Sequence, residues 1–91
     1  MKKRLYATFS GRVQGVGFRA TCRRLAIRRG LTGWVRNLDD GDVRLEAQGE
    51  ADALEAFLSD VRAGPVGAGI QNEQVDWREP TPGEDEFEIR L

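Results

Sequence analysis

The spacing of apolar residues along this chain changes from a period of two to a period of about 3.6 and back, twice over. Leu5, Ala7 and Phe9 alternate with polar residues, which predicts a half-buried strand over residues 5–13. Apolar side chains then recur at intervals of three and four before Gly30, as expected of one helix face: Phe18, Cys22, Leu25 and Ala26. The chain therefore begins with a strand, a loop and a helix.

A hairpin and a second helix are predicted next. Residues 31–38 and 43–47 have strand patterns, and the acidic, glycine-containing stretch 39–42 between them is typical of a turn. The segment from Glu50 to Arg62 has helical spacing of its apolar residues, with acids at its start and a base at its end. This charge layout is the usual one for a helix.

The last third of the chain completes the pattern. Residues 66–72 show no regular period, residues 75–77 suggest a fourth strand, and residues 87–91 alternate as a final strand. The order βαββαβ with an extra terminal strand predicts an α+β fold. We expect a two-layer ferredoxin-like sandwich, in which two helices cover one face of an antiparallel sheet.

Composition narrows the possible functions. The length of 91 residues fits one domain, which we place at residues 1–91. Cys22 is the only cysteine and there is no histidine, which excludes an internal disulfide, a cysteine-only metal site and imidazole catalysis. No stretch approaches the roughly 20 apolar residues of a membrane span, and the N-terminus does not resemble a signal peptide. We therefore expect a cytoplasmic protein without a membrane partner.

The charges are segregated along the chain. Residues 1–38 hold ten basic side chains and no acid, whereas residues 39–91 hold all 15 acids and only four bases. An anionic partner for the first part is one interpretation. Mutual attraction between the two parts of one domain is the other.

The loop between the first strand and the first helix has the composition of a phosphate site. Gly11, Gly15 and Gly17 allow unusual backbone angles, and Arg19 lies where a helix normally carries acids. Amides at such a helix start bind anions, and a guanidinium adds a planar donor. The spacing matches neither common nucleotide-binding loop. A tight turn without a ligand is therefore the alternative.

Two motifs resemble the signatures of the acylphosphatases. The first is Gly11-Arg12-Val13-Gln14-Gly15-Val16-Gly17-Phe18-Arg19, and the second is Gly33-Trp34-Val35-Arg36-Asn37-Leu38 with an Asp-Gly after it. The resemblance covers nearly the whole chain, including Gly64-Pro65 and the closing Phe87-x-Ile89. It implies the same ferredoxin-like fold and a single acylphosphatase-like domain.

The resemblance also implies the site and the reaction. Backbone amides of the loop would hold a phosphoryl group, Arg19 would bind it, and Asn37 would position the attacking water; the loop residues are Gln14, Gly15, Val16, Gly17, Phe18 and Arg19. The substrates would be small acyl phosphates and the products a carboxylate and inorganic phosphate. The leaving carboxylate has a pKa of about 4, so a site without histidine suffices. We expect no cofactor, no metal, no nucleic-acid partner and a monomer.

Other interpretations remain beside this one. The fold also serves RNA-binding modules, although the third strand, with Val43, Leu45 and Ala47, lacks their aromatic residues. A phosphate-binding relative without activity would share the loop, and a similar module begins the larger hydrogenase-maturation carbamoyl transferases. Glu73 stands where the family has an apolar strand residue, which favours a late start or a bulge in the fourth strand.

Two further groups of residues are predicted to have structural roles only. Trp34 is expected to pack against the domain and not to contact substrate. Asp39, Asp40 and Asp42 lack the spacing of a calcium loop and are predicted to form a solvated turn.

Overall fold

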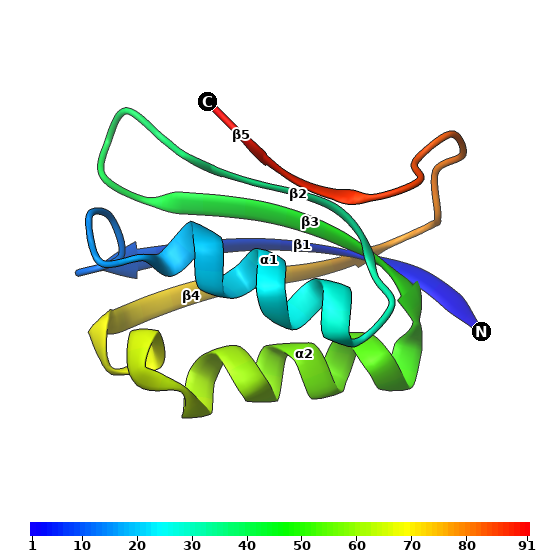
Figure 1. Ribbon diagram of the computed structural model, residues 1–91, viewed down its shortest axis with the longest axis horizontal. Coiled ribbons are helices and arrows are strands. Elements are labelled where there is room, and N and C mark those ends of the chain that lie inside the picture. Colours follow the sequence, from blue (N-terminus) through cyan, green and yellow to red (C-terminus); the bar gives the residue numbers. More distant parts are fainter.

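In the computed structural model, which describes residues 1–91, two helices lie on one face of a five-stranded sheet (Figure 1). The elements are β1 (Lys2–Gly11), α1 (Phe18–Arg28), β2 (Thr32–Asn37), β3 (Val43–Glu50), α2 (Ala51–Ala63), the 3₁₀ turn η1 (Pro65–Gly69), β4 (Ile70–Arg78) and β5 (Phe87–Arg90). The predicted order of elements and the two-layer α+β class are confirmed. None of the helices is long and apolar enough to cross a membrane.

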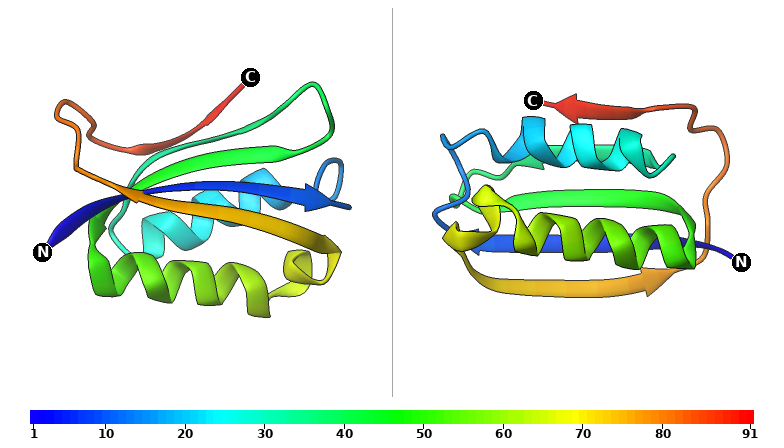
Figure 2. Two further views of the ribbon diagram at one scale, coloured as in Figure 1. Left: turned by 180° about the vertical axis from the view of Figure 1, so that it is seen from behind. Right: turned by 60° about the horizontal axis from the view of Figure 1, so that its bottom comes forward.

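The sheet differs from the prediction in one pairing. Its strand order is β4-β1-β3-β2-β5, and the three pairings among the first four strands are antiparallel. β5 instead joins β2 in parallel, so the sheet is mixed. The connection over residues 79–86 carries the chain from one sheet edge to the other and reverses its direction (Figure 2). β4 is antiparallel to β1, and β1 has the same direction as β2. The reversal between β4 and β5 therefore gives β5 the direction of β2.

The core lies between the sheet and the helices. The alternation predicted for the first strand is confirmed, because Leu5, Ala7 and Phe9 are all buried under the helices. The helix faces predicted from the spacing are buried as well: Phe18, Cys22, Leu25 and Ala26 from α1, with Leu54, Phe57, Leu58 and Val61 from α2. Gly30 ends α1 in the left-handed conformation, and the next amide, that of Leu31, donates to the Ala26 carbonyl at 2.9 Å.

Glu73 is accommodated by an ion pair, and the bulge in β4 lies nearer the start of the strand. The expected late start of the fourth strand is wrong, because β4 already begins at Ile70. Its register against β1 shifts between Ser10 and Gly11, which confirms the alternative of a bulge. Glu73 pairs with Phe9 across the strands and so faces the helix layer. There its carboxylate accepts hydrogen bonds from the Arg62 guanidinium at the end of α2. An ion pair thus takes the place of apolar packing at this edge.

The opposite face of the sheet is covered by arginines. Trp34 is only 9% exposed, and the guanidinium carbons of Arg36 and Arg90 lie 5.8 and 4.9 Å from its ring centre. Tyr6 is flanked by Arg44 and Arg78 in the same way. Trp34 therefore packs against the domain, as predicted.

Arg4 is the one buried charged residue, and it ties the connection 79–86 to the sheet. Its guanidinium donates to Glu46 at 2.9 Å, to Gln48 at 3.0 Å and to both carboxylate oxygens of Glu84 at 2.9 and 3.0 Å. The hydrogen bond from Arg4 lowers the pKa of Glu84 below its usual range, although burial acts in the opposite direction.

Replacing Arg4 should destabilise the fold in a pH-dependent way. Arg4→Met keeps an apolar stem but leaves Glu46 and Glu84 side by side and half-buried, so we expect the free energy of unfolding to fall by about 2–4 kcal/mol at pH 7. Because the Glu84 pKa is depressed, the stabilisation is present above the ordinary glutamate pKa and is lost as pH falls through the folded value. The difference in free energy of unfolding between Arg4→Met and wild type, measured by urea unfolding, should therefore be smaller at pH 3 than at pH 7. An equal difference at both pH values, or one matched by Arg24→Met, would contradict this role.

Candidate active site

The glycine loop, residues 12–17, is anchored to the core at both ends. Val13 and Phe18 are each 1% exposed, and the Phe18 ring lies 5.3 Å from that of Phe9, centre to centre. Between these anchors Gly15 and Gly17 have φ angles of 77° and 79°. A Cβ at either glycine would meet no atom within 4 Å, so glycine is required there for its left-handed backbone and not for space. The loop is thus held at its ends and curved in between.

The start of α1 is open to an anion. Gly17 caps the helix without a side-chain hydrogen bond, and the first turn holds no acid, whereas the first turn of α2 holds Asp52. Arg19 is half-buried in that first turn and takes part in none of the ion pairs of the molecule. Free amides, the positive end of the helix dipole and an unpaired guanidinium therefore converge on one place.

Asn37 shares a hollow with this loop. It is the last residue of β2, and its Oδ1 is buried without any hydrogen-bond partner. A hollow of about 180 Å³ is lined by Val13, Gly15, Gly17, Phe18, Arg19, Ala20, Asn37 and Ile89. The structure thus places Arg19 and Asn37, the two residues that the family resemblance implies, on one small cavity. A buried acceptor without a donor is uncommon, so the fold itself does not satisfy the side-chain oxygen of Asn37.

Gln14 has a role that the sequence does not reveal. Its side-chain amide donates to the carbonyl oxygens of Leu38 and Asp42, at 2.8 and 2.9 Å. Those two residues close the turn between β2 and β3, where the Leu38 amide also donates to Asp42. The Gln14 side chain therefore ties the glycine loop to the residue that follows Asn37.

Some predicted residues lie elsewhere, and three residues of the hollow were missed: Val13, Ala20 and Ile89. The side chains of Gln14 and Val16 do not line the hollow, so their predicted part in phosphate binding rests on their backbone amides. Ile89 of β5 does line it, although the sequence suggested only alternation with Phe87. The parallel pairing of Ile89 with Val35 brings it there, and a period-two pattern does not tell which neighbour a strand will have.

The hollow offers groups that bind and orient a ligand, but no conventional general acid or base. Arg19 is the only ionisable side chain on its lining, and no carboxylate or imidazole is present. Cys22 is buried on α1, and burial raises the pKa of its thiol to about 12. The acidic turn forms no cluster of metal ligands: Asp40 Oδ1 accepts a hydrogen bond from the Asp42 amide at 3.0 Å, which closes the turn.

Comparison with known proteins decides the family. The family model described as Acylphosphatase matches residues 5–89, which is most of the chain. The chain belongs to the acylphosphatase family. An acylphosphatase of Salinibacter ruber is 48% identical over 89 residues, which cover 98% of this chain and 94% of the relative. A crystal structure of the acylphosphatase from Bacillus subtilis superposes with a TM-score of 0.91 at 35% identity, covering 98% and 99% of the two chains.

The acylphosphatase fold also occurs inside a larger protein. Full-length HypF, in its phosphate- and nucleotide-bound form, matches all of this chain with a TM-score of 0.87 and 26% identity, but the match covers only 12% of HypF. The chain therefore resembles both free-standing acylphosphatases and one part of a larger protein. Identity is higher to the free-standing proteins.

Removing the Gln14 side-chain bonds should slow turnover more than it weakens phosphate binding. We expect Gln14→Leu to lower kcat about ten- to a hundredfold, because a small misplacement between the loop and Asn37 disturbs attack geometry. Competitive inhibition by inorganic phosphate should change little, since the loop amides remain. Gln74→Leu, an exposed change on β4, is the matched control. An unchanged kcat, or equal losses in kcat and phosphate affinity, would contradict a positioning role.

Proposed function

We propose that this acylphosphatase hydrolyses small acyl phosphates in the hollow between the glycine loop and Asn37. The observation that carries the proposal is that Asn37, whose Oδ1 has no hydrogen-bond partner, lines the same hollow as Arg19 and the open start of α1. An anion bound to the amides and Arg19 would have a water on Asn37 as its neighbour. Family membership supports the same reaction.

The reaction needs little from the protein except positioning. Water held by Asn37 attacks phosphorus while the bond from phosphorus to the acyl oxygen breaks, and the electron pair leaves with the carboxylate. Charge on the equatorial oxygens is met by the loop amides and Arg19. Asn37 accepts a hydrogen bond but cannot take a proton at pH 7, so the proton of water passes to a phosphate oxygen or to solvent. The products are a carboxylate and inorganic phosphate.

Hydrolysis of benzoyl phosphate in the presence of a chelator tests the proposed function. Loss of ultraviolet absorbance reports turnover directly, and the chelator removes any contribution from adventitious metal. We expect rapid turnover by the folded wild-type protein. A folded protein that binds inorganic phosphate without turnover would be an inactive relative, and one that does neither would be an unrelated module.

The pH dependence should reveal no ionising group of the protein. Because Arg19 is the only charged residue lining the hollow, we expect kcat between pH 5 and 8 to follow only ionisation of the substrate phosphate. Profiles for two acyl phosphates with different phosphate pKa values measure this. A bell-shaped profile that stays fixed when the substrate changes would point to a general acid and base.

The face of the sheet opposite the helices bears on the RNA-binding alternative. Val43, Leu45 and Ala47 are buried toward the helices, so the absence of aromatics at these positions says nothing about the exposed face. That face holds Tyr6 and Trp34, whose rings are flanked by arginines and are not bare stacking platforms for bases. We propose that it binds no nucleic acid. Submicromolar binding of single-stranded RNA at physiological salt, surviving Arg19→Ala, would overturn this.

The expectations about domain organisation, oligomeric state and cellular location are proposals as well. We propose that residues 1–91 form a single domain that acts as a monomer in the cytoplasm. Support comes from the family model, which spans residues 5–89, and from one apolar cluster of 19 buried residues that links both layers. Sedimentation at micromolar concentration tests the monomer. A concentration-dependent increase in mass would show self-association.

A further inference from the structure

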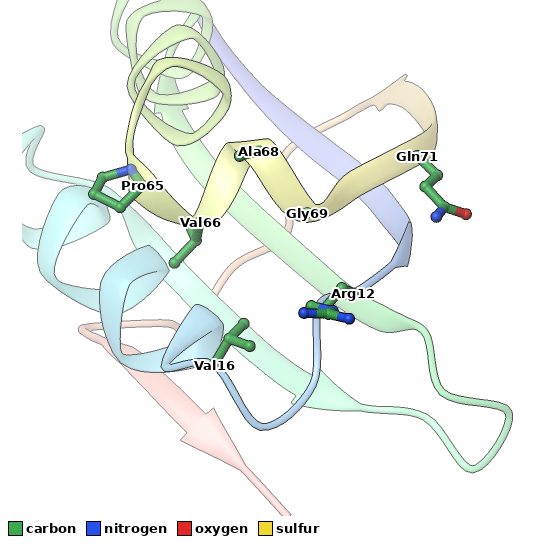
Figure 3. A pocket seen from close by; sticks show the side chains of 7 residues that line it. All are labelled: Arg12, Val16, Pro65, Val66, Ala68, Gly69 and Gln71. Atoms are coloured by element: carbon green, nitrogen blue, oxygen red, sulfur yellow. The ribbon is translucent and has the colours of Figure 1, made fainter.

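A second, larger depression lies on the other side of the glycine loop. It has a volume of about 500 Å³ and is lined by Arg12, Val16, Pro65, Val66, Ala68, Gly69 and Gln71 (Figure 3). Gly15 and Gly17 line the hollow with Asn37, whereas Val16 between them lines this groove. One loop thus separates and borders both spaces. We call the larger space the η1 groove.

One side of the η1 groove is apolar, and a backbone contact holds it in place. Pro65, Val66 and Ala68 come from η1, and Val16 from the loop points across toward Val66 (Figure 3). Val16 is 44% exposed, one of the few large apolar side chains that the fold leaves open. The Arg12 amide donates to the Gly69 carbonyl at 2.9 Å, and a Cβ at Gly69 would collide with the Arg12 carbonyl. This close backbone contact holds η1 against the loop.

Arg12 supplies the only charge on the η1 groove. Its guanidinium is in none of the ion pairs or side-chain hydrogen bonds, and η1 contains no charged residue. Figure 3 places Arg12 toward the Gln71 end of the groove, away from Val66. The groove therefore offers an apolar strip with an unpaired cation at one end. A ligand that fits this surface has an apolar body and an anionic end.

The reaction geometry assigns this side to the acyl group. In an in-line displacement the leaving oxygen lies opposite the attacking water across the phosphorus atom. Asn37 belongs to β2, on one side of the loop that follows β1, whereas η1 leads into β4 on the other side. With water on Asn37, the acyl group departs toward η1.

We propose that the η1 groove is the acyl-group subsite and that Arg12 selects acyl phosphates whose acyl part carries a second negative charge. The apolar strip at Val16 and Val66 contacts the carbon skeleton, and Arg12 pairs with the distal anion. Because this inference rests on the proposed function, its test compares two substrates of one reaction. The selectivity can then fail while hydrolysis itself stands.

The test uses p-toluoyl phosphate and 4-carboxybenzoyl phosphate, which differ by a methyl group and a carboxylate of similar size. We expect the ratio of kcat/KM values, carboxylate over methyl, to fall about three- to fivefold in Arg12→Gln, the range of an exposed ion pair. The same ratio of kcat/KM values, measured for wild type, should also fall with added salt, whereas the ratio measured for Arg12→Gln should not. Arg28→Gln, an exposed change at the far end of α1, removes the same charge and controls for the electrostatic effect of the protein's net charge. Equal ratios in wild type and Arg12→Gln, or an equal fall in Arg28→Gln, would overturn the role of Arg12.

A second variant tests occupation of the groove without touching its charge. Ala68 is exposed on η1, so Ala68→Trp can fill the groove while the fold is kept. We expect KM for p-toluoyl phosphate to rise at least about threefold relative to KM for acetyl phosphate, whose acyl group is much shorter. An unchanged KM ratio would place the acyl group elsewhere. If wild type hydrolyses neither compound, the proposed function fails as well as the subsite.

Discussion

Replacing Arg19 with glutamine should abolish most activity and slightly stabilise the protein. Arg19 takes part in no ion pair and lines the hollow, and in the proposed mechanism it meets the charge that develops on the phosphoryl oxygens. Loss of one oxyanion donor costs roughly a hundred- to a thousandfold in rate, and loss of a charged arginine in phosphoryl transfer costs about a thousandfold or more. We expect kcat/KM for benzoyl phosphate to fall about a thousandfold in Arg19→Gln.

The effect on stability has the opposite sign. A cation in the first turn opposes the helix dipole, at a cost of about 0.3–1 kcal/mol when no anion is bound. Without ligand, Arg19→Gln should therefore unfold at slightly higher urea concentration than wild type. Inorganic phosphate should raise the free energy of unfolding of wild type. This stabilisation should be absent in Arg19→Gln.

A matched substitution separates these effects from a general change in charge. Arg24→Gln removes the same charge from an exposed position of α1 that does not border the hollow. It should retain wild-type kcat/KM and phosphate stabilisation. Loss of activity in Arg19→Gln accompanied by lower stability would show a structural role instead. A similar loss in Arg24→Gln would show that only the net charge of the helix matters.

The parts of the site that sequence could predict are those built from neighbouring residues. Glycines at 15 and 17 and an acid-free first turn with Arg19 are local signals for an anion site, and the structure shows the left-handed angles and open helix end that they indicate. Asn37 carries no such signal of its own. Its assignment came from the resemblance to the family, and the structure adds its buried, unpartnered Oδ1.

The parts that could not be predicted depend on contacts between distant residues. Arg4 has the sequence position of an exposed strand residue, yet it is buried because Glu84, 80 residues away, folds over it. Gln14 is polar in a polar loop, and its role appears only when the turn at Leu38 is beside it. Period-two patterns fix which face a residue occupies but not which strand lies next to it. That is why the final strand was predicted but its parallel pairing with β2 and the place of Ile89 on the hollow were not.

Replacing Asn37 should separate turnover from phosphate binding. Asn37→Ala removes the buried Oδ1 but leaves the loop amides and Arg19 in place. A water without its positioning partner loses attack geometry, so we expect kcat to fall about a hundred- to a thousandfold. The inhibition constant for inorganic phosphate should stay close to that of wild type. Stability should not fall, because an unsatisfied buried acceptor has been removed.

Asn37→Asp makes the test sharper, because the isosteric aspartic acid is neutral, as asparagine is, only when protonated. At pH 7 the carboxylate repels the phosphoryl group and weakens phosphate binding, whereas acid restores a neutral side chain. Activity of Asn37→Asp relative to wild type should therefore rise as pH falls from 7 toward 4. Asn72→Ala, an exposed change on β4, should behave as wild type throughout. If Asn37→Ala loses phosphate binding as strongly as turnover, Asn37 holds the phosphoryl group and the attacking water is positioned by another group.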